Sequence, residues 1–263
     1  MSYILIDAGN SCLKLSILDK IDNSDIYYTV LDYSNLYNDL IAEIQNDVVS
    51  DVVVSNVNNP VIFHTIADVV YQLWRIQPRQ VIVQQDSYGI STRYNNPRLL
   101  GSDRWLALIA ARAEFKKAIC VVDCGTAVTI DVVSGEGMHI GGLITPGLKT
   151  SRDALGLKAN NLPLVENTHV EKRSENNNNK SSFLATTTQD AILGGTLYQI
   201  SAYIERIVSE IMQEFGENTE CIITGGDAEQ IQSLTLHQFH YRETLVLEGL
   251  RIVARDLLDK ERI

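Results

Sequence analysis

The sequence is short of basic residues. Its 22 lysines and arginines face 33 aspartates and glutamates, so the formal net charge is −11. Non-specific binding to nucleic acid depends on a basic surface that displaces counterions, and we therefore expect no nucleic-acid partner. Small anionic ligands stay open, because a nest of backbone N–H groups can hold phosphate even in an acidic protein.

Cysteine clusters and long apolar runs are also missing. Cys12, Cys120, Cys124 and Cys221 have no metal-knuckle spacing, and we expect buried, reduced thiols. No apolar run approaches the about 18 residues that suggest a membrane-spanning helix, and the N-terminus lacks the basic-then-apolar pattern of a signal peptide. We therefore expect a cytoplasmic protein without a membrane partner.

The sequence does contain enough apolar residues for a sizeable core. Of its 263 residues, 45% are hydrophobic and 21% are charged, which are ordinary values for a globular protein. Short apolar runs predict strands within YILI, CLKLSIL, DIYYTVL, DVVVSNV, RQVIVQ and ECIIT. Apolar residues spaced three to four apart predict helices at residues 36–45, 61–74, 103–117, 188–215 and 244–258.

Two of the predicted helices carry start signals. Ser102 is placed to cap the helix at 103–117. Thr187 and Asp190 fit a capping box at the start of the helix at 188–215. Both helices are therefore expected to begin at these polar residues.

Three other features have mainly structural interpretations. Gly194 and Gly195 cost about 1 kcal/mol each relative to alanine inside a helix, so we expect close backbone packing there, against a second subunit. The asparagine-rich segment 166–182 predicts a surface loop. Arg152 and Asp153 are interpreted as surface charges on a helix.

One pattern occurs twice: a strand that ends in an acid, a glycine turn and a second strand. The first copy is YILIDAGNSCLKLSIL and the second is AICVVDCGTAVTIDVV, so that Asp7 corresponds to Asp123. Two halves that begin alike indicate a duplicated α/β unit. We expect domains at 1–117 and 118–263, with a cleft between them.

The residue types in these turns suit phosphate. Glycine lets backbone N–H groups approach an anion without interference from a Cβ, and the preceding acid can hold a metal ion that bridges phosphate oxygens. Asn10 and Thr126 add neutral hydrogen-bonding groups. A single D-x-G-N is equally a common tight hairpin turn. Two copies, with a third glycine-rich turn at TGGD, favour phosphate binding over that interpretation.

Together these turns resemble the phosphate and adenosine motifs of the acetate kinase, sugar kinase, Hsp70 and actin superfamily. Within it, the set DAGNS, YNNPRLLGSDRW, DCGTAVTID, GGLITPG and TGGDA is similar to the type III pantothenate kinases. The resemblance implies two similar ribonuclease H-like α/β domains with the active-site cleft between them, and a homodimer. It also implies ATP-dependent phosphorylation of pantothenate to 4′-phosphopantothenate, the first step of coenzyme A biosynthesis.

The resemblance also implies roles for residues of the phosphate turns. Asp7 would lie near Mg²⁺, through water, and Asp123 would coordinate a monovalent cation, K⁺ or NH₄⁺. Thr126 would belong to the second phosphate loop, and residues 224–227 would lie towards adenosine. The implied first ATP-binding loop consists of Asp7, Ala8, Gly9, Asn10, Ser11, Cys12, Leu13 and Lys14.

For the site that binds pantothenate, the phosphoryl acceptor, the resemblance implies Asp103 as the proton acceptor. Judged without it, Asp103 could simply cap a helix and Arg104 could be a solvated charge. In the first turn of a helix, the dipole favours the carboxylate and should lower its basicity, so orientation of the substrate hydroxyl would be its main contribution. The implied pantothenate-binding residues are Tyr94, Gly101, Ser102, Asp103, Arg104 and Thr188.

Two other functions stay open at this point. One is a kinase of the same superfamily that acts on a sugar, against which the YNNP and GSDR motifs argue. The other is a non-catalytic, nucleotide-binding regulatory protein. The presence of Asp7, Asp103 and Asp123 argues against that function, because a regulator needs neither a base nor metal-binding acids.

Overall fold

The computed structural model describes residues 2–22, 25–159, 162–165 and 184–261. The asparagine-rich segment 166–182 lies outside the described residues. The first of two compact units consists of Met1–Ile119, Asp131–Gly141 and Thr244–Ile263, and the second of Cys120–Ile130 and Gly142–Glu243. Among the described helices, none has the length and apolar character to cross a membrane.

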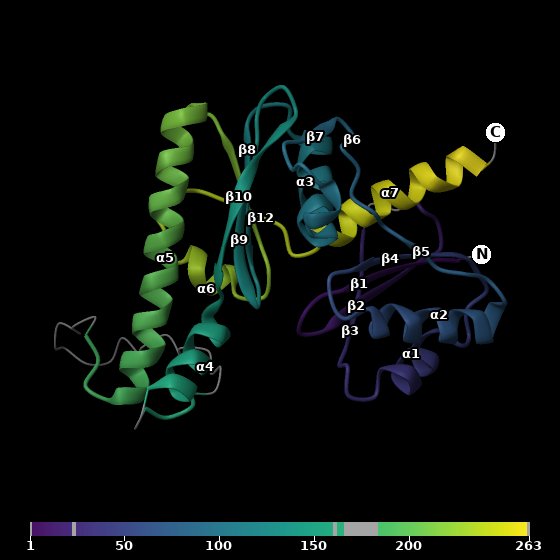
Figure 1. Cartoon of the computed structure of the whole chain (residues 1–263), viewed down its shortest axis with the longest axis horizontal. Coiled ribbons are helices and arrows are strands. Elements are labelled where there is room, and N and C mark those ends of the chain that lie inside the picture. The colour runs from purple at the N-terminus through teal and green to yellow at the C-terminus, as the bar shows by residue number, and fades with distance from the viewer. Residues whose placement is uncertain (1, 23–24, 160–161, 166–183, 262–263) are drawn as a thin grey trace. The chain divides into compact units, whose positions relative to one another are not determined.

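The first unit contains a five-stranded sheet in the order β3-β2-β1-β4-β5 (Figure 1). Its strand β1 pairs antiparallel with β2 and parallel with β4. Only Arg79–Gln80 of the predicted strand RQVIVQ is in the sheet, as an edge strand. The strands are β1 (Ser2–Ala8), β2 (Leu13–Leu18), β3 (Thr29–Leu31), β4 (Val49–Asn56) and β5 (Arg79–Gln80).

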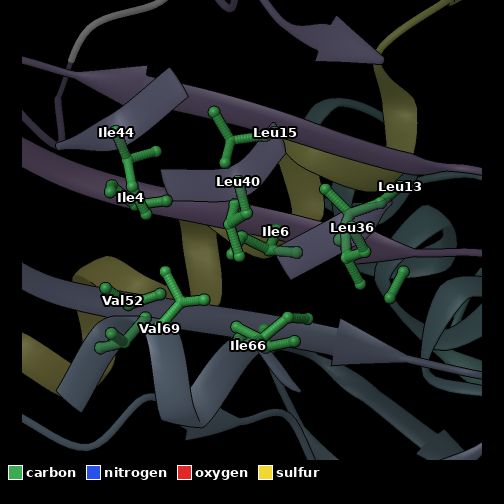
Figure 2. Packing of buried hydrophobic residues seen from close by; sticks show 13 residues of the cluster. Ile4, Ile6, Leu13, Leu15, Leu36, Leu40, Ile44, Val52, Ile66 and Val69 are labelled. Atoms are coloured by element: carbon green, nitrogen blue, oxygen red, sulfur yellow. The ribbon is translucent and has the colours of Figure 1, made fainter. Parts of the chain in front are cut away.

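The core of this unit lies between the sheet and the helices α1 (Leu36–Ile44) and α2 (Pro60–Trp74). Figure 2 shows side chains of both helices meeting alternate residues of the strands, because successive strand residues point to opposite faces. Each buried aliphatic side chain contributes roughly 1.5–3 kcal/mol. The labelled members are Ile4, Ile6, Leu13, Leu15, Leu36, Leu40, Ile44, Val52, Ile66 and Val69.

The other face of this sheet is covered by α3 (Ser102–Glu114) and α7 (Leu245–Glu261), which contact β4 and, for α7, also β1. The two helices pack closely, since a Cβ at Gly249 of α7 would collide with the backbone oxygen of Leu106 in α3. The unit also contains β6 (Asp86–Ser87), β7 (Ile90–Thr92) and the 3₁₀ helix η1 (Pro97–Leu99).

The second sheet has the order β12-β11-β8-β9-β10-β7-β6. Its segment β10-β9-β8-β11-β12 repeats the order β3-β2-β1-β4-β5, with β8 and β9 in the positions of β1 and β2. This repetition confirms the duplicated α/β unit expected from the sequence. The remaining elements are β8 (Ile119–Cys124), β9 (Ala127–Val133), β10 (Met138–Pro146), α4 (Leu148–Lys158), α5 (Thr188–Phe215), β11 (Glu220–Thr224), α6 (Ala228–Gln232) and β12 (His240–Tyr241).

The two predicted helix starts have different outcomes. At α5 the Asp190 N–H donates to Thr187 Oγ1 over 3.1 Å, which confirms the predicted cap. At α3 the prediction is wrong, because Gly101 is the N-cap and Ser102 is already helical. The Ser102 hydroxyl instead lies 3.0 Å from the buried Ser55 hydroxyl, so a tertiary contact replaces the local cap.

Candidate functional site

The first phosphate turn joins β1 to β2 and is held from outside by two side chains. The Gly9 N–H closes the turn by donating to the Cys12 carbonyl over 3.1 Å. The Tyr33 hydroxyl lies 2.6 Å from the Gly9 carbonyl and 2.9 Å from that of Cys12. The Asn58 amide donates to the carbonyls of Gly9, over 2.8 Å, and Asn10, over 3.3 Å. These bonds engage the inward carbonyls, while the tip of the turn stays exposed.

Burial keeps the tyrosine of this clamp a hydrogen-bond donor. Removal of water from its hydroxyl raises the pKa of Tyr33 to about 12, so the proton that bonds the turn stays in place near neutral pH. Burial also raises the pKa of the neighbouring Cys12 thiol, although the charge of Lys14 opposes this effect. The turn therefore carries no thiolate that would repel phosphate.

The acid and the lysine of the first loop lie opposite each other in the sheet. Asp7 pairs with Lys14 on β2 and is buried at the end of β1. The Lys14 ammonium lies 5.1 Å from the ring centroid of Tyr28, a cation–π contact on the strand. Carboxylate oxygens suit Mg²⁺, which uses one or two protein carboxylates together with water and phosphate. Among the described residues no cluster of three or more His, Cys, Asp or Glu could hold a metal.

The acceptor motif begins α3 beside the end of β1. Ser55, which contacts Ser102, is the direct neighbour of Asp7 in the parallel β1–β4 pair. A Cβ at Gly101 would collide with Oδ1 of Asp103, so the glycine leaves space for this carboxylate. The first unit thus brings together two sets of predicted residues, the phosphate turn and the GSDR motif.

The environment of Asp103 differs from the expectation. Its Oδ1 accepts a hydrogen bond from the Arg104 N–H over 2.7 Å, and it lies in the first turn of α3 as predicted. Burial nevertheless raises the pKa of Asp103 and outweighs this hydrogen bond and the charge of Arg104, which both lower it. The predicted loss of basicity is therefore wrong, because loss of hydration disfavours the charged carboxylate more than the helix start favours it.

Arg104 is buried, so its interpretation as a solvated charge is wrong. Its Nε and Nη2 donate to the two carboxylate oxygens of Asp131 over 2.7 and 2.6 Å. Burial lowers the pKa of the guanidinium, but the hydrogen bonds and charge of Asp131 outweigh this effect and raise it, so Arg104 stays charged. Its Nη1 lies 3.4 Å from the hydroxyl of Tyr94, another predicted acceptor residue.

Two residues of this cluster, Asp131 and His139, were not predicted from the sequence. Asp131 ends the DCGTAVTID motif, and that position was the available signal. His139, which lies 2.8 Å from Asp131, has no local motif and was recognisable only from the pairing of β10 with β7. Its spacing along the chain gave no indication of the contact.

The second phosphate turn, between β8 and β9, is held mainly by backbone groups. The Gly125 N–H donates to the Ala127 carbonyl over 3.1 Å, and the Gly147 N–H donates to the Thr126 carbonyl over 3.0 Å. The Thr150 hydroxyl donates to the same Thr126 oxygen over 2.6 Å. A Cβ at Gly147 would collide with the Gly125 carbonyl, so the start of α4 lies directly against the turn.

The TGGD turn lies against the same loop within the second unit. The Asp227 N–H donates to the Cys124 carbonyl over 3.0 Å. Gly225 has a φ of +96°, and a Cβ there would lie 2.5 Å from Cys124 backbone atoms and 2.6 Å from Oδ1 of Asp123. This unit thus brings Asp123, the Thr126 turn and residues 224–227 together. The Asp123 carboxylate offers the hard oxygen donors that an alkali cation requires.

The helices of the second unit hold the remaining candidates. Thr188 is the exposed first residue of α5. Arg152 is buried, and its Nε donates to Thr196 Oγ1 over 3.0 Å, so its interpretation as a surface charge is wrong. Apart from chain neighbours and the backbone of the same helix, no atom of the described residues lies within 4 Å of a Cβ built at Gly194 or Gly195, so no other element packs tightly against them.

Comparison with known proteins assigns the family. Residues 3–210 match the model of the type III pantothenate kinase family. A type III pantothenate kinase of Nitrosococcus oceani is 35% identical over 260 residues, 96% of this chain and 94% of the relative. One from Citrifermentans bemidjiense is 32% identical over 261 residues, 95% of this chain and 97% of the relative.

Two solved structures share the fold. The activator of the 2-hydroxyisocaproyl-CoA dehydratase from Clostridium difficile, with bound ADPNP, has a TM-score of 0.58 at 12% identity, over 100% of this chain and 97% of that one. A conserved protein from Campylobacter jejuni, assigned to the Baf family of transcriptional activators, has a TM-score of 0.55 at 22% identity, over 97% and 99%. These likenesses confirm the expected α/β fold. The sequence matches show that the chain belongs to the type III pantothenate kinase family.

Proposed function

We propose that this chain transfers the γ-phosphoryl group of ATP to the primary hydroxyl of pantothenate and forms 4′-phosphopantothenate, the first step of coenzyme A biosynthesis. The observation that carries the proposal is the contact between Ser102 and Ser55. Ser55 is the strand neighbour of Asp7, so the contact brings the acceptor motif next to the first phosphate turn. A kinase needs this juxtaposition of phosphate donor and acceptor.

Asp103 is the proposed proton acceptor. Its raised pKa makes it a better base than an exposed aspartate, which suits a group that takes the proton of the pantothenate hydroxyl. A loose, metaphosphate-like transition state needs little deprotonation in advance, so Asp103 contributes chiefly by orienting that hydroxyl. Tyr94, Gly101, Ser102, Arg104 and Thr188 are the proposed pantothenate-binding residues.

The two glycine turns are the proposed phosphate-binding elements. Backbone N–H groups of the turns would bind the ATP phosphates, and Asn10 and Thr126 are exposed at the tips. Mg²⁺, near Asp7, would neutralise charge on the phosphate oxygens. Asp123 is the proposed ligand of a monovalent cation, K⁺ or NH₄⁺, and residues 224–227 would lie towards adenosine.

We further propose a cytoplasmic homodimer. Exposed apolar side chains on α4 and α5, among them Leu157 and Tyr198, support self-association, since exposed apolar side chains are candidates for burial in an interface. The open helix surface at Gly194 and Gly195 would let a second backbone approach closely. All four cysteines lie within the described residues and form no disulfide, which suits a reducing compartment.

An assay of ATP consumption tests the proposed function. The purified chain would be given pantothenate or a panel of sugars, with and without K⁺. We expect K⁺-dependent turnover with pantothenate alone. Asp103→Asn should lower kcat by about 10²–10⁴-fold, the usual contribution of a positioned acid–base group.

The matched control is Asp39→Asn, which removes an acid from the first turn of α1 in the same unit. This variant should keep the wild-type rate. Turnover of a sugar instead of pantothenate would indicate a sugar kinase. ATP binding without any turnover would indicate a regulatory protein, and either result would overturn the proposal.

A further inference from the structure

A continuous chain of buried hydrogen bonds connects the backbone of Tyr94 to the guanidinium of Arg104. The Tyr94 N–H donates to Thr92 Oγ1 over 3.2 Å, and this hydroxyl lies 3.0 Å from His139 Nδ1. His139 Nε2 lies 2.8 Å from Asp131 Oδ1, which also accepts from Arg104. All five residues belong to the first unit.

The chemistry of the groups gives this chain a direction. The Asp131 carboxylate only accepts hydrogen bonds, so His139 donates from Nε2. With that proton on Nε2, Nδ1 can accept from the Thr92 hydroxyl, which in turn accepts from the Tyr94 N–H. Every donor then meets an acceptor, which is the arrangement that fixes one ring orientation and one rotamer.

Burial of polar and charged side chains costs free energy, so this cluster is unfavourable for folding if it has no other role. Thr92, Asp131 and His139 are at most 2% exposed. Replacing a buried ion pair by well-packed apolar residues is often neutral or stabilising, so stability alone is a weak reason for this arrangement. A requirement for one fixed geometry of Arg104 and Tyr94 at its two ends is a stronger reason.

Both ends of the chain act on proposed acceptor-binding residues. Asp131 engages Nε and Nη2 of Arg104 and so turns Nη1 towards the Tyr94 hydroxyl, 3.4 Å away. The ring of Tyr94 stacks on that of His139, with centroids 5.8 Å apart and planes inclined by 19°. His139 therefore supports Tyr94 directly and Arg104 through Asp131.

We propose that Thr92, His139 and Asp131 are positioning residues that hold Arg104 and Tyr94 in the geometry that binds pantothenate. This inference rests on the proposed function and adds three residues to it. None of the three needs to touch the substrate. Their loss should weaken acceptor binding, while ATP binding, which depends on the two glycine turns, should stay unchanged.

The mildest test is Thr92→Val, which keeps the shape of the side chain and removes the hydroxyl. We expect the KM for pantothenate to rise about tenfold, the effect of losing a hydrogen bond that supports a charged group, with the KM for ATP unchanged. Thr92→Ser restores the hydroxyl and should restore the KM. The matched control is Ser91→Ala on the same strand. Within the part of the chain that the structure describes, the Ser91 hydroxyl bonds only to Met138 Sδ. It should behave as wild type.

A double-mutant cycle separates positioning from general damage. His139→Gln should raise the KM for pantothenate about tenfold in the wild-type background. It should have a smaller effect in an Arg104→Lys background, because the guanidinium that His139 helps to hold is already gone and only the stacking on Tyr94 is left to lose. Thermal unfolding of each variant shows that it is folded.

Two outcomes would overturn the inference while leaving the proposed function intact. One is a pantothenate KM within twofold of wild type for Thr92→Val. The other is equal increases in KM for ATP and pantothenate, which would indicate a purely structural role. A wild-type protein without pantothenate turnover would instead overturn the proposed function itself.

Discussion

The two phosphate turns lie between β1 and β2 and between β8 and β9, which are equivalent strands of the repeated sheet order, yet they are held by different means. Side chains hold the first, with Tyr33 and Asn58 bonded to its carbonyls. The second is held by hydrogen bonds from the backbone N–H groups of Gly147 and Asp227 and from the Thr150 hydroxyl. The repeated unit therefore shares the position of the turn in the sheet order and not the contacts that secure it.

This difference predicts different responses to mutation. Separate side-chain hydrogen bonds hold the first turn, and mutations can remove them one at a time. The effects of such mutations should therefore be graded. Another backbone segment packs against the second turn and leaves no space for a Cβ. A mutation there should therefore have a larger effect, because backbone atoms have to move.

The acids of the two turns should give the largest and most distinct effects. Asp7→Asn should lower kcat by about 10²–10³-fold and raise the Mg²⁺ concentration that is needed, because it removes a charge beside the phosphates. Asp123→Asn should abolish activation by K⁺ and leave the response to Mg²⁺ unchanged. Measuring activity against Mg²⁺ and K⁺ concentration for both variants checks this. The same change in ion dependence in both variants would show that the two turns do not bind different cations.

Gly147→Ala tests the backbone packing of the second turn. Its new Cβ would collide with the Gly125 carbonyl, so the turn has to move. We expect a loss of about 10²-fold in kcat/KM from misplacement of the phosphate groups, and about 1–3 kcal/mol in the free energy of unfolding from overpacking. Gly135→Ala is the control, since its Cβ would have only ordinary contacts. Wild-type kinetics for Gly147→Ala would refute the proposed rigidity.

Tyr33→Phe tests the clamp on the first turn. Loss of the hydroxyl removes bonds to two carbonyls, so we expect the KM for ATP to rise about fivefold and the free energy of unfolding to fall by about 1 kcal/mol. The KM for pantothenate should not change. Tyr37→Phe, which loses a surface bond to Gln72, is the control. A larger effect than that of Gly147→Ala would reverse the contrast between the turns.

The smallest effect concerns stability and pH at Asp103. Because burial raises its pKa in the folded state, this carboxyl contributes stability that is fully present below its unfolded pKa, about 3.9, and is lost as the pH rises through the folded value. Asp103→Asn should therefore have a higher Tm than wild type at neutral pH, and this advantage should shrink as the pH falls towards about 4. Melting curves across this range check the sign, and a lower Tm for Asp103→Asn at neutral pH would contradict it.

Much of the fold followed from the sequence, because local patterns determine it. The duplicated acid–glycine turn predicted a duplicated α/β unit, which the repeated sheet order confirms, and the Thr187 cap predicted the start of α5. Ser102 did not behave as predicted, because its partner Ser55 lies far away in the chain and local propensity cannot reveal such a contact.

The candidate site was harder to predict for the same reason. Asp7 and Asp123 are proposed from their motifs, while the place of His139 depends on strand pairing between β7 and β10. The pKa of Asp103 shifts in the direction opposite to the prediction, because the sequence shows a helix start and does not show burial. Buried polar side chains are therefore the part of this site that only three-dimensional contacts reveal.

Helix α7 has a consequence for the order in which the protein becomes functional. It is synthesised after all of the second unit, yet it contacts β1 and β4 of the first, where Leu5 and Val53 are buried. While the chain grows on the ribosome, that face of the first sheet is not fully covered until α7 has been synthesised. The unit with Asp7 and Asp103 starts first and is completed last, so a shortened C-terminus would damage the acceptor side before the second phosphate turn.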